Sequence, residues 1–166
     1  LLDTTGLFGN FLELDDNLEE ILEDNSKAND IYFFVGGENY LSEESTEYLM
    51  DFIRAGNTGF ISTEEFPHAL LNLICLDPDD VFAEEVIDSS QYFKFYHSNF
   101  QGKRYKFDFV HNNKVQQKTW DYFDVDAFAL YDGDKLSSLG SNNHDQINFI
   151  KIRYGIGYLF LHSNPY

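Results

Sequence analysis

In the first part of the chain, short apolar runs alternate with a segment whose apolar residues recur at the spacing of an α-helix. The continuous apolar run at residues 31–35 predicts a strand buried on both faces, as in a parallel sheet. Residues 43–54 follow with a helical stripe, which Ser42 caps at the start and Gly56 ends. A short strand at residues 58–61 comes next. This strand–helix–strand unit predicts two parallel strands joined by a right-handed crossover.

Weaker patterns flank this unit on both sides. Residues 10–14 predict a short strand, and residues 17–23 predict an acidic amphipathic helix. Beyond the unit, Ser62 and Glu65 have capping-box spacing and predict a helix that ends near Leu73.

After Asp88 the apolar period changes from helical to alternating. Aromatic and polar residues alternate at 92–96 and at 104–109, which predicts an antiparallel hairpin with one solvated face. A short strand is expected at 127–131, and strands at 147–154 and 158–162 flank a glycine turn typical of a hairpin. We therefore expect an α/β domain with a mostly parallel core and an antiparallel β-rich section after it.

Composition indicates one globular domain over residues 1–166, because this length supports one core and 43% of the residues are apolar. The net charge of −18 is uneven. Residues 1–90 hold 22 acids and two bases, a net −20, whereas residues 91–166 hold seven acids and nine bases, a net +2. Such a surface argues against nucleic acid and anionic lipid as partners.

The ends of the sequence predict a piece of a longer protein. The chain opens at Leu1 without methionine and closes at Tyr166 directly after an apolar strand. No apolar run reaches about 18 residues, so a membrane contact would need segments outside this chain.

Residues 31–63 and the tail at 148–162 together resemble a bacterial family known as domain of unknown function 4350. Its members pair a segment like residues 41–57 with a short strand, and carry a Tyr-Gly-x-Gly hairpin ending in Leu-His, as at residues 154–162 here. The resemblance implies a three-layer fold related to class I glutamine amidotransferases and flavodoxin-like domains. It also implies an extracytoplasmic domain that flanking transmembrane helices tether to a bacterial membrane, and it supplies no catalytic residues.

The candidate nucleophiles lack the surroundings that catalysis needs. Cys75 lies at the apolar end of a helix rather than on a strand-to-helix elbow, which predicts core packing. Ser62 precedes a predicted helix, but no Gly-x-Ser-x-Gly surrounds it and capping explains it. His162 is expected to be a hydrogen-bonded residue at a strand end.

Metal and cofactor motifs are also missing from the sequence. The five histidines have no ligand spacing, and the aspartates of the later loops do not match a calcium loop. These aspartates are Asp121, Asp124, Asp126, Asp132 and Asp134. We predict no catalytic residue, no metal site and no cofactor.

Two surfaces remain as candidate binding sites. Gly36 and Gly37, with Glu38 and Asn39, follow a predicted strand and precede a helix, which is where open α/β sheets bind ligands. A second candidate is an exposed patch of Tyr92, Tyr96 and Trp120 bordered by Lys94 and Arg104.

The function predicted from these features is a non-enzymatic module that contacts an unidentified protein partner. A small-ligand-binding domain that uses the crevice near Gly36 is the first alternative. The second alternative is an unrecognised amidotransferase-like hydrolase.

Overall fold

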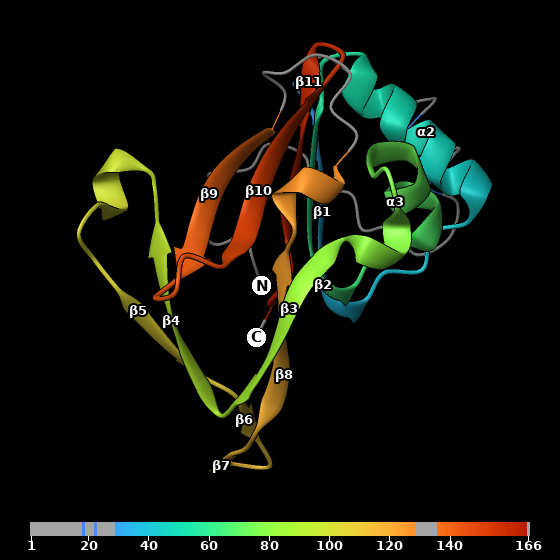
Figure 1. Cartoon of the computed structure of the whole chain (residues 1–166). Coiled ribbons are helices and arrows are strands. Elements are labelled where there is room, and N and C mark those ends of the chain that lie inside the picture. The colour runs from blue at the N-terminus through green and yellow to red at the C-terminus, as the bar shows by residue number, and fades with distance from the viewer. Residues whose placement is uncertain (1–17, 19–21, 23–28, 129–135, 166) are drawn as a thin grey trace.

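The fold is organised around one mixed, strongly curled sheet of nine strands (Figure 1). The computed structural model describes residues 18, 22, 29–128 and 136–165. Seven strands follow the order β1-β2-β11-β10-β9-β4-β5; β8 joins this path by pairing with β10, and β3 pairs with β8. The sheet bends so far that its two ends lie on opposite walls of a half-barrel.

The helices and strands have the following bounds. The main sheet contains β1 (Ile31–Glu38), β2 (Thr58–Glu65), β3 (Phe82–Asp88), β4 (Ser90–Phe95), β5 (Tyr105–Asp108), β8 (Lys118–Phe123), β9 (Leu136–Asn142), β10 (Ile147–Tyr154) and β11 (Gly157–His162). A separate small hairpin is formed by β6 (Val110–His111) and β7 (Lys114–Val115). The helices are α2 (Glu43–Arg54) and α3 (His68–Ile74), and the 3-10 turns are η2 (Pro78–Asp80), η3 (Ser98–Phe100) and η4 (Val125–Ala127).

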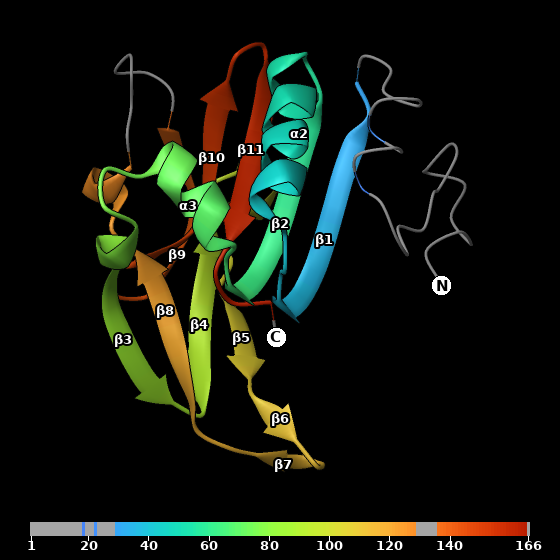
Figure 2. The same cartoon turned by 90° about the vertical axis from the view of Figure 1, so that its right-hand side faces the viewer.

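The expected three-layer α/β fold with a mostly parallel core is wrong, and with it the amidotransferase-like and flavodoxin-like architecture. Among the described strands, only β1 with β2 and β2 with β11 pair in parallel, and the other strand pairs are antiparallel. In the described part of the chain, α2 and α3 lie together on one face of the sheet (Figure 2). A three-layer sandwich needs helices on both faces, which local patterns alone do not determine.

The strand–helix–strand unit was predicted correctly except for the burial of its first strand. β1 and β2 are parallel, the Ser42 side chain caps α2 by accepting from the Ser45 N–H, and Gly56 after the helix has a φ of 110°. However, β1 is the end strand of the sheet order and is not buried on both faces.

The predicted helix cap at Ser62 is wrong. β2 continues to Glu65, and Ser62 is buried within it. The pairing of β2 with β1 on one side and β11 on the other outweighs the local capping signal. Helix α3 starts only after Pro67, whose ring is compatible with a helix start but not with a helix interior.

The later hairpins are confirmed. β4 pairs with β5 and β10 with β11, both antiparallel. The strands β3, β8 and β9 were not expected from the sequence. Of the strand expected at 127–131, Ala127 lies in η4, Phe128 forms an isolated bridge with Cys75, and residues 129–131 fall outside the described residues. The strand expected at 10–14 also falls outside them, and only Leu18 and Leu22 of the expected first helix are described, both as helical.

The two faces of the sheet carry different side chains. Ile61, Ile150 and Leu159 point toward the helices and belong to the main core. Their strand neighbours alternate to the other face. There, aromatic rings form a continuous row, in which Phe33 stacks on Phe60 at 4.9 Å, Phe60 meets Phe149 at 6.1 Å, and Phe149 meets Phe95 at 6.4 Å between ring centroids.

The end of α2 approaches the turn between β10 and β11 so closely that a glycine is required there. A Cβ added to Gly157 would lie 2.0 Å from the carbonyl oxygen of Ile53 and 2.3 Å from that of Asn57. These are backbone atoms, so the helix would have to move away from the sheet.

We expect Gly157→Ala to lower the free energy of unfolding by about 3 kcal/mol or more, because overpacking against backbone cannot be relieved by a rotamer change. Urea denaturation monitored by circular dichroism measures this. Gly102→Ala is the matched control, because Gly102 has a φ of 77° but no heavy atom within 4 Å of an added Cβ. Its cost is expected to be only about 1 kcal/mol, from the backbone conformation. Equal losses in both variants would contradict the close approach.

Candidate functional site

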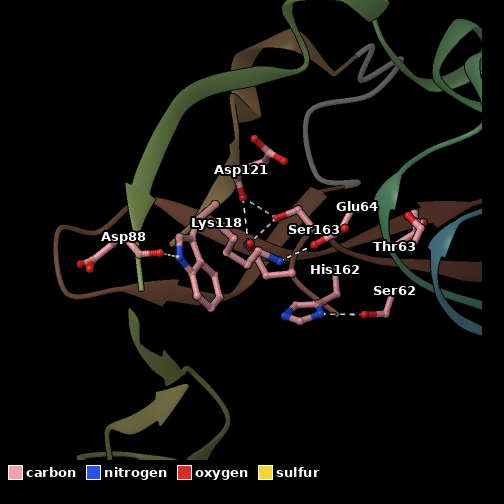
Figure 3. A network of polar contacts seen from close by, with 11 residues as sticks. Ser62, Thr63, Glu64, Asp88, Lys118, Asp121, His162 and Ser163 are labelled. Carbon is pink, nitrogen blue, oxygen red and sulfur yellow. Dashed lines mark hydrogen bonds and ion pairs between the residues drawn. The ribbon is translucent and has the colours of Figure 1, made fainter. Parts of the chain in front are cut away.

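A cluster of polar side chains lies where β2, β11 and β8 meet (Figure 3). Ser62 and His162 stand opposite each other in the parallel register of β2 and β11. The Ser62 Oγ lies 2.8 Å from the His162 Nδ1, which is hydrogen-bonding distance. The pair joins residues 100 positions apart in the sequence.

The second ring nitrogen of His162 also has a partner. The side-chain Nδ2 of Asn148 on β10 lies 3.3 Å from the His162 Nε2. The Asn148 Oδ1 is buried and has no hydrogen-bond partner among the described residues. Burial, and secondarily the charge of Lys118, lower the pKa of His162 to about 4, so the imidazole is neutral at pH 7. A neutral imidazole is one donor and one acceptor, which matches its two contacts.

Lys118 places a positive charge beside this histidine. Its Nζ forms an ion pair with the Glu64 carboxylate of β2, and its side chain is only 7% exposed. The same Nζ lies 4.8 Å from the ring centroid of Trp120, within range of a cation–π contact. Figure 3 shows the His162 ring between Ser62 and Lys118.

The residues that follow β11 complete the cluster with two further hydrogen bonds. The Ser163 Oγ donates to the Asp121 carbonyl oxygen at 2.6 Å, and the Asn164 Nδ2 donates to the same oxygen at 2.9 Å. Ser163 and Asn164 are 1% and 4% exposed. The cluster therefore ties β8 to the strands β2 and β11.

The position of the imidazole proton and the burial of Ser62 limit what the Ser62–His162 pair can do chemically. A serine nucleophile is activated by an imidazole nitrogen that accepts its proton. Here the Asn148 Nδ2 can only donate to the His162 Nε2, so the Nδ1 carries the imidazole proton and faces the Ser62 Oγ as a donor. Ser62 is also 3% exposed and lies within a strand that is paired on both sides. A nucleophile has to be presented to its substrate, as on a strand-to-helix elbow. We conclude that this pair holds β11 to β2 and stabilises the curled sheet.

Asp121 contributes its carbonyl oxygen to this cluster, and the other chemical candidates of the sequence lie apart from it. Cys75 is buried at the end of α3, as expected, and burial raises the pKa of its thiol to about 12. Asp124 caps η4, and Asp132 and Asp134 lie outside the described residues. Within the part of the chain that the structure describes, no three His, Cys, Asp or Glu residues are grouped to hold a metal ion.

The predicted ligand residues Gly36, Gly37, Glu38 and Asn39 lie side by side along the end of β1 and just after it. The strand continues through both glycines, and the Thr63 hydroxyl donates to the Gly37 carbonyl oxygen at 2.9 Å. Asn39 is 5% exposed, and its Nδ2 has no hydrogen-bond partner among the described residues. Ligand binding at these residues stays a prediction.

The predicted aromatic patch is wrong in one of its three members. Trp120 is fully buried, and its indole N–H donates to the Asp88 carbonyl oxygen at 2.9 Å. It packs edge-on against Phe93 in a second small core, because β8, which sequence reasoning missed, covers β4. Tyr92 and Tyr96 are 43% and 45% exposed.

These two tyrosines share one face of the β4–β5 hairpin with basic residues. Tyr92, Lys94 and Tyr96 alternate with buried or half-buried phenylalanines along β4. Lys94 forms an ion pair with Asp145, and Tyr96 donates to the Ser141 Oγ at 2.9 Å. At the hairpin end, a surface pocket of about 480 Å³ is lined by Lys94, Phe95, Tyr96, Gln101, Gly102, Lys103 and Arg104.

Comparisons with known proteins show little beyond these observations. No protein-family model and no curated protein matches the chain. Several solved structures resemble it, and in the two described here the chain spans half or less of the other protein. The exo-β-1,4-mannosidase Op5Man5 from Opitutaceae bacterium strain TAV5 is 10% identical with a TM-score of 0.47, covering 76% of this chain and 19% of the mannosidase. Cytoplasmic protein STM3548 from Salmonella typhimurium is 13% identical with a TM-score of 0.45, covering 75% of this chain and 50% of that protein.

We transfer no activity from either protein, because both TM-scores lie below 0.5. Membership of the domain of unknown function 4350 family stays a prediction, and so does the extracytoplasmic location. None of the helices described here has the length and apolar character needed to cross a membrane.

The low pKa of His162 predicts a pH-dependent stability. Its folded-state pKa of about 4 lies below its ordinary value of 6.5, so between these values the unfolded chain binds a proton that the native state does not. The free energy of unfolding should therefore fall as the pH drops from about 7 to about 4, by up to about 3 kcal/mol.

We expect this loss to be absent from His162→Gln, because glutamine keeps hydrogen-bonding groups but does not titrate. The measurement is urea denaturation of both proteins between pH 7 and pH 4, with the exposed His111→Gln as the control. Parallel pH profiles for the wild type and His162→Gln would show that His162 does not titrate in this window.

Proposed function

We propose that the chain is a non-enzymatic protein-interaction module that binds an acidic segment of a partner protein on the aromatic and basic face of the β4–β5 hairpin. We define this face by Tyr92, Lys94, Tyr96, Arg104 and Lys106. The observation that carries the proposal is the exposure of two tyrosines, at 43% and 45%, beside these bases.

The charge of the hairpin supports an acidic partner. Residues 89–107 contain four bases and no acid, in a chain with a net charge of −18. Lys94 and Lys106 already pair with Asp145 and Asp108. Lys103 and Arg104 are exposed and form no ion pair with the described residues, so they are available to a partner's carboxylates.

The residue types of the hairpin face support a protein rather than a nucleic acid as the partner. Tyrosine and arginine are enriched among the residues that dominate protein interfaces, since both combine apolar area with polar groups. The net charge of −18 repels a polyphosphate at long range, whereas a short acidic peptide can approach the basic face alone. Salt screening should weaken such an interaction.

The proposal is tested by selecting binders from a random peptide library displayed on phage, with the immobilised full chain as the target. We expect enriched peptides rich in Glu and Asp with aromatic residues. Synthetic versions should lose at least tenfold in affinity, measured by fluorescence anisotropy, with Tyr96→Ala or with Arg104→Ala, because these variants remove a hot-spot ring or a charge.

Tyr40→Ala is the matched control, since Tyr40 is 81% exposed but lies outside the hairpin. Its affinity for the same peptides should stay within twofold of the wild type. Acidic peptides that bind all three variants equally would contradict the proposal, as would a selection that enriches no acidic peptide.

A further inference from the structure

We propose that β1 is a second docking edge, which accepts an extended, basic segment of a partner protein as an added strand. This inference does not rest on the hairpin face, because β1 and β5 are the opposite ends of the sheet order.

The face of β1 that points away from the helices is apolar and exposed. Ile31, Phe33 and Val35 are 58%, 53% and 50% exposed, whereas Tyr32 between them is 8% exposed on the helix side. Phe33 stacks on Phe60 of β2 with an interplanar angle of 11° between the two rings. Three alternate apolar residues at this level of exposure form a surface that an adjacent strand could cover.

The edge of β1 is open for backbone pairing within the described structure. β1 is eight residues long and ends the sheet order. Among the described strands it pairs only with β2, in an unbroken parallel register from Ile31 to Gly36. Soluble proteins usually protect such an edge with a lysine, a proline, a bulge or a very short strand. β1 contains none of these devices. An exposed, unprotected edge is the structure that strand addition uses, with main-chain hydrogen bonds giving affinity and alternate side chains giving specificity.

The charge of the residues near β1 indicates which kind of partner segment can pair with this strand. Glu38 at the end of β1 stands beside Glu65 of β2 in the register, and both are exposed. Glu43 and Glu44 follow in the first turn of α2, and both are exposed as well. Basic residues at the matching end of an added strand would face these carboxylates, whereas an acidic strand would be repelled.

The negative charges near β1 also make a second copy of this chain an unfavourable partner for the open edge of β1. Pairing β1 with β1 of another molecule would bring two surfaces of equal negative charge together, and like charges across an interface reduce affinity. The occupant we infer is therefore a foreign segment with alternating apolar residues and with Lys or Arg between them.

A ten-residue peptide in which Val and Lys alternate is a suitable probe. We expect the wild-type chain to bind it with an affinity that falls as salt rises, because charge contributes to the contact. Val35→Lys should weaken binding at least tenfold, since it puts a protective charge on the edge. Ile156→Lys is the matched control, because Ile156 is 70% exposed in the turn between β10 and β11. It should change binding less than twofold.

A second peptide separates strand addition from simple charge attraction. Prolines at alternate positions keep the charge but remove backbone donors, so this peptide should bind at least tenfold more weakly. Circular dichroism and urea denaturation confirm that each variant is folded. Tyr96→Ala should leave binding of the Val-Lys peptide unchanged, although we expect it to weaken binding of the acidic peptides to the hairpin face. The two proposals can therefore fail independently of each other.

Three outcomes would overturn the inference. The first is no detectable binding of the Val-Lys peptide to the wild-type chain. The second is equal binding by wild type and Val35→Lys, or equal binding of the two peptides. The third is a stable dimer of the wild-type chain in sedimentation that Val35→Lys abolishes, because the edge would then be occupied by a second copy.

Discussion

The parallel pairing of β11 with β2 is the interaction on which the rest of the sheet depends. It aligns five successive residue pairs and places one strand from each half of the chain side by side, as the second and third strands of the sheet order. β10 is positioned by its hairpin to β11, and α2 packs over β2, β10 and β11. The Ser62–His162 hydrogen bond lies at the last of these aligned pairs, where the segment after β11 also binds β8. The polar cluster therefore connects β2 and β11 to β8, which together with β3 lies off the main path of the sheet.

The sheet order also separates the charges of the molecule. The acidic first half supplies β1 at one end of the order, and the basic hairpin supplies β5 at the other. Because the sheet curls, the two ends form opposite walls of the half-barrel, and the row of aromatic rings extends between them from Phe33 to Phe95. The two proposed docking surfaces therefore lie on separate edges of the sheet, and segments bound there would not compete with each other.

Local patterns predicted local structure well and the architecture poorly. The cap at Ser42, the glycine at position 56 and the two late hairpins follow from signals within a few residues of one another. Ser62 carried an equally good local signal for a helix start, but its strand neighbours override that signal in the folded chain.

The candidate site could be predicted only in part for the same reason. Tyr92 and Tyr96 are exposed as the alternation suggests, whereas Trp120 is buried because β8 covers β4. Nothing near Ser62 indicates that His162 is its partner 100 residues later. A buried polar residue within a strand does require a hydrogen-bond partner, and this is the signal that could have prompted a search for one.

The long separation between β2 and β11 has a consequence during protein synthesis. The β1–α2–β2 unit is complete once residue 65 has been made, but one edge of β2 stays without its partner until residues 157–162 leave the ribosome. Contacts between distant residues form slowly, and unpaired strand edges of incomplete chains are prone to aggregate. Interrupted translation would therefore release a fragment with two open strand edges, and such a fragment is a natural substrate for chaperones or proteases.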